Sequence, residues 1–254
     1  MLFTEMIKAC CLRLLAAFAI WAAVPICAQD KYEVLAKVLQ PYGALFYSKS
    51  AIKAVDAEVI PREGPIAFLN QKVRIALQLP DKLRLESLDP EKQAVLCRSG
   101  QRVWVYPKSL AADVMVSRTS KGKIPDFRLP FKDQEIVMLP ALFQILGFRA
   151  QTDPDGDSLW VMELRLAPEI VDALNAGPWT ATVTVRQNNY QVRRIQISSD
   201  TWTGSLELAK ASFSRELPAQ TWQPGAAYTE GATFVQPDLF APVLAKLTGL
   251  DLFQ

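Results

Sequence analysis

Apolar and polar residues alternate along most of the chain between residues 55 and 213, and this period of two predicts β-strands. Lys72–Leu79 is the clearest strand, because its odd-numbered residues are apolar and its even-numbered residues are mostly polar. Turn signals such as Pro80-Asp81 and Ser99-Gly100 follow closely, which favours antiparallel hairpins. The other predicted strands are 55–59, 83–86, 94–97, 102–106, 159–166, 180–186, 190–198 and 204–213.

Four segments have a helical spacing instead. Asp30 to about Ser48 is predicted to be a helix that Asp30 caps and that Pro41 kinks or divides. Gln134–Phe148 is predicted to be a helix that is bent at Pro140 and apolar around much of its circumference. Shorter helices are expected at 168–174 and 237–247, with a polar loop at 117–130. Few helices among many hairpins indicate an α+β fold.

Most predicted strands carry apolar side chains on one face and charged ones on the other, so we expect one face to be covered and one to be wet. The apolar residues are even-numbered at Tyr190 and Val192 but odd-numbered at Ile195 and Ile197, which suggests a β-bulge between them. The apolar face fits either a plain packed core or a partly filled hollow for an acyl chain. Periodicity alone favours the plain core.

The N-terminus is typical of a secretory signal peptide. Every residue from Leu14 to Val24 is apolar, after the basic residues Lys8 and Arg13. Signal cores span about 7–15 residues, whereas a membrane helix needs about 20. We expect cleavage after Ala28 and export to the periplasm, in preference to a lipid anchor at Cys27 or an uncleaved anchor.

Composition excludes several function classes. The chain has no histidine, which removes the commonest general base and the commonest metal ligand. The formal net charge of +2 does not predict a nucleic-acid partner. Cys97 is the only cysteine after the predicted signal peptide, so no internal disulfide is expected. We expect a buried apolar residue there in preference to a reactive thiol.

No catalytic or metal-binding constellation stands out. Asp153, Asp155 and Asp157 match the first half of a calcium loop, but Ser158 and Leu164 stand where glycine and glutamate are needed, so a hairpin turn is favoured. The basic residues Lys121, Lys123, Arg128 and Lys132 are interpreted as a solvated loop in preference to an anion site. We therefore predict no catalytic residue, no metal and no cofactor. The carboxylates lie on different strands without an evident acid–base pair: Glu58, Glu63, Glu86, Glu163, Glu207 and Glu216.

Five segments, in order along Ala54–Pro224, resemble motifs of the periplasmic outer-membrane lipoprotein carrier (LolA/LolB-like) superfamily. Lys72–Leu85 resembles its "strand, Pro-Asp-x-hydrophobic-Arg, strand" motif, and Ser99–Tyr106 resembles its "Asp-Gly-Lys-x-hydrophobic-Trp-x-Tyr" hairpin. Met162–Pro168 is similar to its "Leu-x-Leu-x-Pro" strand end. The closing strands are matched by Arg193–Ile197 and Phe213–Pro218.

The resemblance implies a strongly curved, incomplete antiparallel β-barrel with helices that form a lid or plug over a hydrophobic cavity. It implies a signal peptide at 1–28, a half-barrel domain at 29–235 and a C-terminal helical extension at 236–254. Ser99 departs from the family's acidic residue, and the family's cavity arginine matches no single residue. The candidate cavity residues are Val73, Ile75, Leu77, Leu83, Leu85, Trp160, Met162, Leu164, Val183 and Val185. The candidate lid residues are Leu35, Val38, Leu39, Leu139, Leu142, Phe143 and Leu146.

The leading hypothesis is a monomeric, non-enzymatic periplasmic carrier or chaperone that binds acyl chains of lipoproteins or lipid. The resemblance implies an inner-membrane releasing complex and an outer-membrane acceptor as partners, and no nucleic acid. The alternative is a periplasmic sensor or interaction module of the same fold. An envelope hydrolase is disfavoured by the missing histidine and carboxylate pair.

Overall fold

The computed structural model describes residues 30–63, 71–116, 133–168, 171, 179–199 and 203–248. The predicted signal peptide, the polar loop 117–130 and the basic patch lie outside the described residues, as does most of the predicted helix 168–174. Within the described part of the chain, no helix is both long and apolar enough to cross a membrane.

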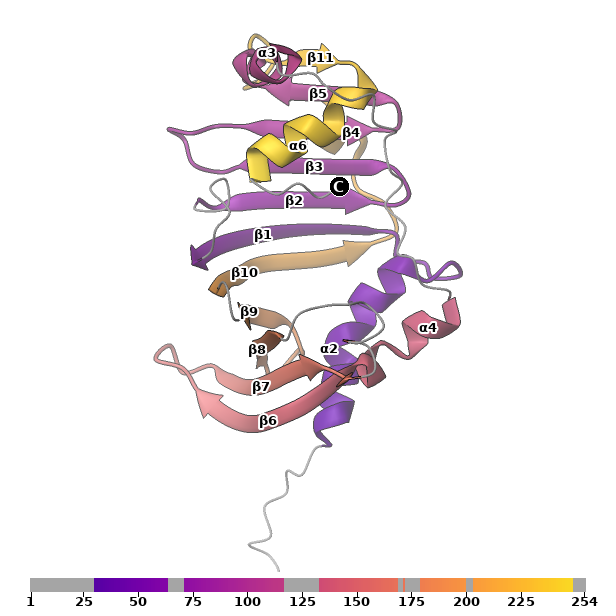
Figure 1. Cartoon of the computed structure of the whole chain (residues 1–254), viewed down its shortest axis with the longest axis vertical. Coiled ribbons are helices and arrows are strands. Elements are labelled where there is room, and N and C mark those ends of the chain that lie inside the picture. The colour runs from indigo at the N-terminus through magenta and orange to yellow at the C-terminus, as the bar shows by residue number, and fades with distance from the viewer. Residues whose placement is uncertain are drawn as a thin grey trace, which may run out of the picture.

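The described strands form a single antiparallel sheet of eleven strands (Figure 1). Its order is β11-β5-β4-β3-β2-β1-β10-β9-β8-β7-β6, so the meanders β1–β5 and β6–β10 meet where β1 pairs with β10, and β11 is added beside β5. The strands are β1 Ala54–Glu63, β2 Val73–Gln78, β3 Lys82–Ser87, β4 Val95–Ser99, β5 Arg102–Tyr106, β6 Phe143–Thr152, β7 Ser158–Leu166, β8 Trp179–Arg186, β9 Val192–Ser199, β10 Thr203–Ser214 and β11 Thr233–Val235.

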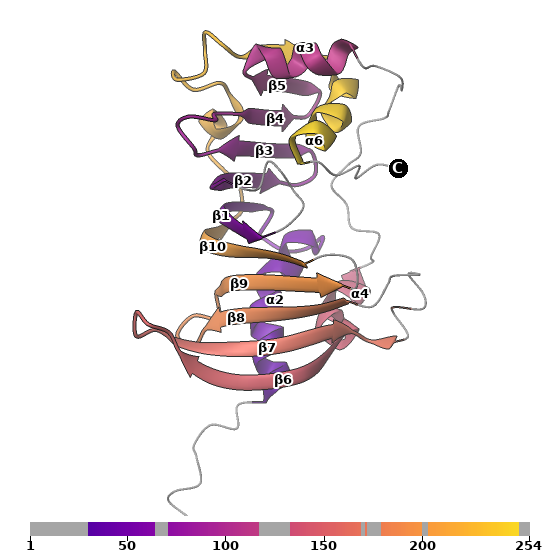
Figure 2. The ribbon, with the colours of Figure 1, turned by 60° about the vertical axis from the view of Figure 1, so that its left-hand side comes forward.

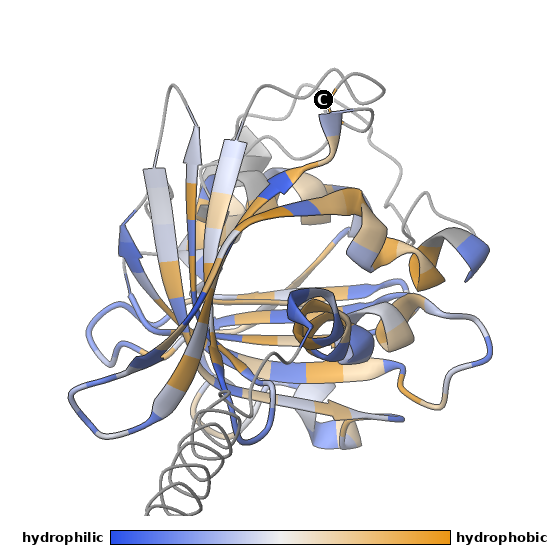
Figure 3. Cartoon of the chain, turned by 90° about the horizontal axis from the view of Figure 1, so that it is seen from below, coloured by the Kyte–Doolittle hydropathy of each residue, from blue (hydrophilic) through white to orange (hydrophobic). Residues whose placement is uncertain are grey.

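Helices cover the two ends of one face of this sheet. Helix α2 lies against β6–β9, whereas α3 and α6 lie against the β2–β5 end (Figures 1 and 2). Seen from below, the sheet curves strongly around its helices (Figure 3). The described helical segments are α2 Lys31–Phe46, α3 Lys108–Val116, α4 Asp133–Val137, η2 Leu139–Leu142, η3 Ala219–Trp222, η4 Pro237–Leu239 and α6 Phe240–Thr248.

The predicted fold class is confirmed. The sheet is curved and open, with β11 and β6 as its two edges, and all nine predicted strands are present. The predicted bulge is also present, because Thr184 pairs with Arg194 and Val185 pairs with Val192, which leaves Arg193 as the extra residue. Two strands were not predicted: β6, and β11, whose three residues are too few to show a period.

Helix α2 begins where the sequence predicts. The Asp30 carboxylate accepts a hydrogen bond of 2.9 Å from the Tyr32 backbone N–H, which satisfies one of the unpaired donors of the first turn. Pro41 does not divide the helix, which runs unbroken to Phe46. The buried side chains of Val34, Leu35 and Val38 follow the three-and-four spacing and face the sheet.

The helix predicted for Gln134–Phe148 is wrong. Only Asp133–Val137 is α-helical, Leu139–Leu142 is a short 3-10 turn, and Phe143 begins β6, which pairs along its length with β7. The register shifts between Ile145 and Gly147, so Leu146 is an extra residue in the strand. This bulge places apolar residues side by side and disguises the period of two as a helical spacing.

Candidate functional site

The face that carries α2 and α6, here called the inner face, is apolar across the sheet. On β2 its residues are Val73, Ile75 and Leu77, which pair with Val59, Ala57 and Val55 on β1. The strand register continues this surface through Leu208 of β10, Ile195 of β9, Val183 of β8 and Met162 of β7. The candidate cavity residues therefore share one face, as the alternation predicted.

At the β6–β9 end of the inner face, α2 is packed directly onto the sheet. Met162 and Val185 are fully buried in this cluster, and Val34 and Leu35 of α2 cover them. Such complete burial contributes about 1.5–3 kcal/mol for each large apolar side chain. Seven of the candidate residues belong to this cluster, with Leu39 and Phe143 packed at its margin: Leu35, Val38, Trp160, Met162, Leu164, Val183 and Val185.

At the β2–β5 end, the C-terminal helix α6 packs onto the inner face, as α2 does at the other end. Phe240 and Val243 of α6 are fully buried against Val73 and Leu85. Residues 236–248, the described part of the segment expected as a C-terminal extension, thus contribute to the core at this end. The candidates Val73 and Leu85 belong to this second cluster, and Ile75 and Leu83 pack at its margin. The structure therefore divides most of the candidate cavity residues between two packed groups, and Leu77 belongs to neither.

Between the two clusters the inner face is apolar and only half-buried. Ile75 and Leu77 of β2 keep partial exposure, although their neighbours at both ends of the sheet are buried. The same holds for Val55 and Ala57 of β1, Leu206, Leu208 and Phe213 of β10, and Ile195 and Ile197 of β9. The centre of the curved sheet therefore presents apolar side chains that the helices do not fully cover.

A groove of about 380 Å³ lies between α2 and the α4–η2 segment, and Leu39, Gly43, Ile136 and Leu139 line it. Asp133 fixes α4 there, because its carboxylate accepts hydrogen bonds from the Ser48 backbone N–H (3.1 Å) and hydroxyl. These bonds lower the pKa of Asp133. The remaining lid candidates lie apart from the groove lining, with Leu142 half-buried in η2 and Leu146 of β6 48% exposed.

The opposite face, here called the outer face, is not wholly wet as the alternation predicted. Residues 217–232 cover it over β3–β5, opposite α6 (Figure 2). Beneath them, Arg84 donates to Glu86 at 2.9 Å and to the Thr221 carbonyl at 2.9 Å, while the Tyr228 hydroxyl donates to Glu86 at 2.6 Å. Burial and this hydrogen bond raise the pKa of Tyr228 to about 12.

Cys97 lies within the same covered part of the outer face. Its side chain has no exposed surface, and its thiol lies 3.6 Å from the Trp222 carbonyl. Burial raises the pKa of the thiol to about 12, so the reactive thiolate is strongly disfavoured. The interpretation of Cys97 as a buried apolar residue is confirmed.

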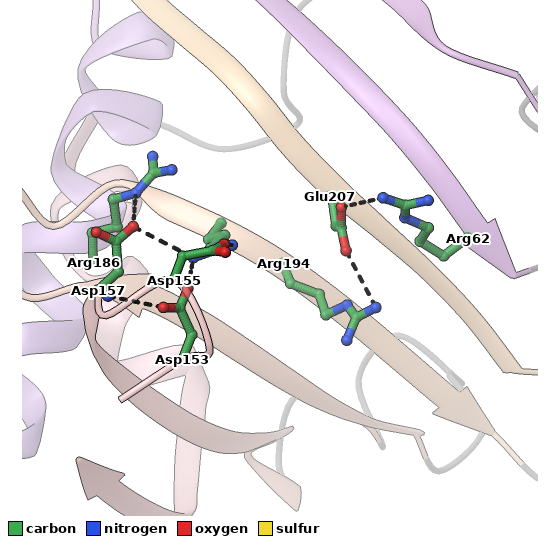
Figure 4. Close-up of polar contacts among 8 residues, drawn as sticks. Arg62, Asp153, Asp155, Asp157, Arg186, Arg194 and Glu207 are labelled. Atoms are coloured by element: carbon green, nitrogen blue, oxygen red, sulfur yellow. Dashed lines mark hydrogen bonds and ion pairs between the residues drawn. The ribbon is translucent and has the colours of Figure 1, made fainter. Parts of the chain in front are cut away.

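The acidic turn between β6 and β7 is neutralised by arginines. Arg193, the extra residue of the bulge, forms ion pairs with Asp153, with Asp155 (3.1 Å) and with Asp157 (3.4 Å). Asp157 also pairs with Arg186 at 3.3 Å (Figure 4). The favoured prediction, a hairpin turn, is therefore confirmed over the calcium loop, and arginines hold the turn.

Most carboxylates on the described strands pair with cations rather than with each other. Glu207 lies between Arg62 (2.8 Å) and Arg194 (3.3 Å), and the bond to Arg62 lowers its pKa (Figure 4). Glu58 pairs with Lys72 at 2.7 Å and Glu163 with Arg149 at 2.6 Å. Among the described residues, no group of three His, Cys, Asp or Glu side chains could hold a metal ion.

No known family profile matches the sequence, and no curated protein matches it significantly. Among solved structures, the chain is similar to the lipoprotein LppX of Mycobacterium tuberculosis, with 16% identity, 74% of this chain and 99% of that chain covered, and a TM-score of 0.39. It is also similar to MucB in complex with MucA, with 9% identity, 78% of this chain and 60% of that chain covered, and a TM-score of 0.38. A LolA superfamily protein from Nitrosomonas europaea is similar with 11% identity, 73% of this chain and 96% of that chain covered, and a TM-score of 0.28.

Proposed function

We propose that this protein is a non-enzymatic periplasmic carrier that binds acyl chains of lipoproteins or lipid at the centre of its inner face. The observation that carries the proposal is the half-buried apolar surface of β2, β1, β10 and β9 between two helix-covered ends. Apolar surface of this kind is usually matched to a ligand or partner. The resemblance of the sequence motifs to lipoprotein carriers points to the same cargo.

The affinity of such a face would come from burial alone. Each methylene removed from water contributes about 0.8 kcal/mol, so eight methylenes contribute roughly 6 kcal/mol before the costs of ordering. Release then requires the helices to move or the cargo to pass to another protein. An inner-membrane releasing complex and an outer-membrane acceptor are the proposed partners, and a monomer is the proposed carrier.

The test is to purify the exported protein, extract it with organic solvent and identify bound lipid by mass spectrometry. A fluorescent dodecanoic-acid probe then measures binding to the lipid-free protein. Ile75→Asp places a charge on the central inner face and should weaken probe binding at least about tenfold. Ile60→Asp is the matched control, because Ile60 is also half-buried but lies on the outer face, opposite Glu207.

Two outcomes would contradict the proposal: a lipid-free protein that does not bind the probe, or equal loss of binding in both variants. Recovery of a stable protein partner, together with absence of acyl binding, would support the sensor or interaction module instead.

A further inference from the structure

The outer face holds a second pocket, of about 560 Å³, at the end of the sheet where β3, β4, β5 and β11 lie side by side (Figure 1). Lys82, Ser99 and Arg102 form part of its polar lining, and Trp104, Trp222 and Phe234 are its aromatic lining. It lies on the opposite side of the sheet from the acyl-binding centre proposed above, so the two sites do not share residues.

The strand register places the three polar residues in one row. Lys82 pairs with Ser99, and Ser99 pairs with Arg102, so the serine stands between two cations on neighbouring strands. Two strand spacings separate the cations by roughly 10 Å at the backbone, and both side chains are long enough to reach an anion above Ser99. No aspartate or glutamate is among the described residues that line the pocket, and neither cation has an ion pair with a described residue.

The walls of the pocket are held in place without a ligand. Arg84 donates to the backbone carbonyls of Thr221 (2.9 Å) and Gln223 (3.3 Å), and the Trp104 indole N–H donates to the Trp222 carbonyl at 3.1 Å. These bonds fix the 219–224 segment beside the row of polar residues. A preformed pocket loses little entropy when it binds.

An apolar surface adjoins the cations. Phe234 of β11 pairs with Trp104, yet its side chain is 64% exposed, far more than the neighbouring aromatic side chains. Lys82 lies 5.6 Å from the centre of the Trp222 ring, which holds its ammonium group at the pocket. The pocket therefore combines two cations that form no ion pair with a described residue, a hydroxyl donor and an exposed aromatic ring.

We propose that this outer-face pocket binds a phosphate ester that carries an apolar group. Arginine, lysine and serine donors together match the several oxygen acceptors of a phosphate, and the Phe234 ring contacts the apolar group. Such an ester can come from the headgroup region of a membrane phospholipid or from a soluble phosphorylated molecule. This binding is independent of the proposed carriage of acyl chains on the inner face.

The test uses ¹⁵N-labelled protein without its signal peptide and dihexanoyl phosphatidylglycerol below its micelle concentration. Amide shifts are expected around Ser99, Arg102 and Phe234. Lys82→Ala/Arg102→Ala should weaken binding at least about tenfold, and Phe234→Ala should weaken it less. Lys92→Ala/Lys210→Ala removes the same charge from exposed positions outside the pocket and should leave binding unchanged. Arg102→Ala alone, on an exposed side chain, gives a second variant should the double variant not fold.

Further arms separate this site from the inner face and identify the source of the ester. Ile75→Asp should leave these amide shifts intact even where it abolishes acyl binding. Binding to anionic phosphatidylglycerol vesicles supports a membrane source, and binding only to the short-chain lipid supports a soluble one. Equal affinity for inorganic phosphate, equal loss in both double variants, shifts confined to the inner face, or no binding would each overturn the proposal.

Discussion

Arg84 and Glu86, two positions apart on β3, form an ion pair of 2.9 Å on the outer face, with 5% and 6% of their surfaces exposed. Arg84 also lies beside the rings of Trp104 and Tyr228, at 5.3 and 5.7 Å from their centres. Charged residues at these positions would be solvated on a bare sheet. Here they hold the 217–232 segment to the sheet, so we expect these outer-face contacts to stabilise the fold.

Removing one partner of this pair should be costly. Arg84→Ala leaves buried Glu86 with only the more distant Arg74, at 4.0 Å. We expect a loss of about 3 kcal/mol in the free energy of unfolding, the lower end of the range for a broken buried pair, measured by urea denaturation. The control is Arg149→Ala, because the Arg149–Glu163 pair is half exposed and should contribute about 0–1 kcal/mol. Equal losses in both variants would show that the outer-face pair is not important for stability.

Tyr228 should make stability depend on alkaline pH. Its pKa is about 12 in the folded protein, against the ordinary value of 10.0, so folding favours the protonated phenol. This contribution is fully present below pH 10 and is lost as the pH rises toward 12. Tyr228→Phe should reduce the fall in unfolding free energy between pH 10 and 12. An unchanged pH profile in the variant would contradict the assignment.

Cys97 should not react with thiol reagents while the protein is folded. Burial raises the pKa of its thiol from 9.0 to about 12, so little thiolate forms at neutral pH. We expect no modification by dithiobis-nitrobenzoate at pH 8, and one equivalent of modification in the protein without its signal peptide after unfolding in urea. Rapid labelling of the native protein would disprove the buried placement.

The C-terminal helix α6 should contribute to the free energy of unfolding as a core element does. Phe240→Ala empties a fully buried position on α6, and we expect a loss of about 3–5 kcal/mol of unfolding free energy. Phe234→Ala is the matched control, since its ring is 64% exposed and its removal should cost about 0.5 kcal/mol or less. If the two variants were equally stable, α6 would be an appendage and not part of the core.

Arg193 should contribute more to the stability of the fold than its neighbour Arg194. Arg193→Ala leaves Asp153, whose side chain is 7% exposed, without its cation, and we expect a loss of about 1–3 kcal/mol. Arg194 is 49% exposed and pairs with Glu207, so Arg194→Ala should cost about 0–1 kcal/mol. Chemical denaturation of both variants measures the difference, and the reverse order would contradict the role of the bulge.

Local pattern predicted the strands well because most strand pairs keep an unbroken alternation, as Lys72–Leu79 does. It failed at Phe143–Thr152, where the extra residue Leu146 interrupts the alternation and the pairing with β7 overrides the helical spacing. Pattern also could not show that residues 217–232 cover Arg84 and Glu86, since this contact joins distant parts of the chain. The alternation predicted that the candidate cavity residues share one face, but their division between α2 and α6 depends on tertiary packing.

The junction of β1 with β10 has a consequence for how the chain assembles. Within each meander, neighbouring strands are consecutive in sequence and can pair through short loops. At the junction, Ala54 pairs with Ser214 and Glu63 with Ser205, which brings together segments from near the two ends of the chain. Closing so long a loop is slow, so we expect two separately forming half-sheets whose joining limits the folding rate. The apolar centre of the inner face spans this junction and is complete only after that last step.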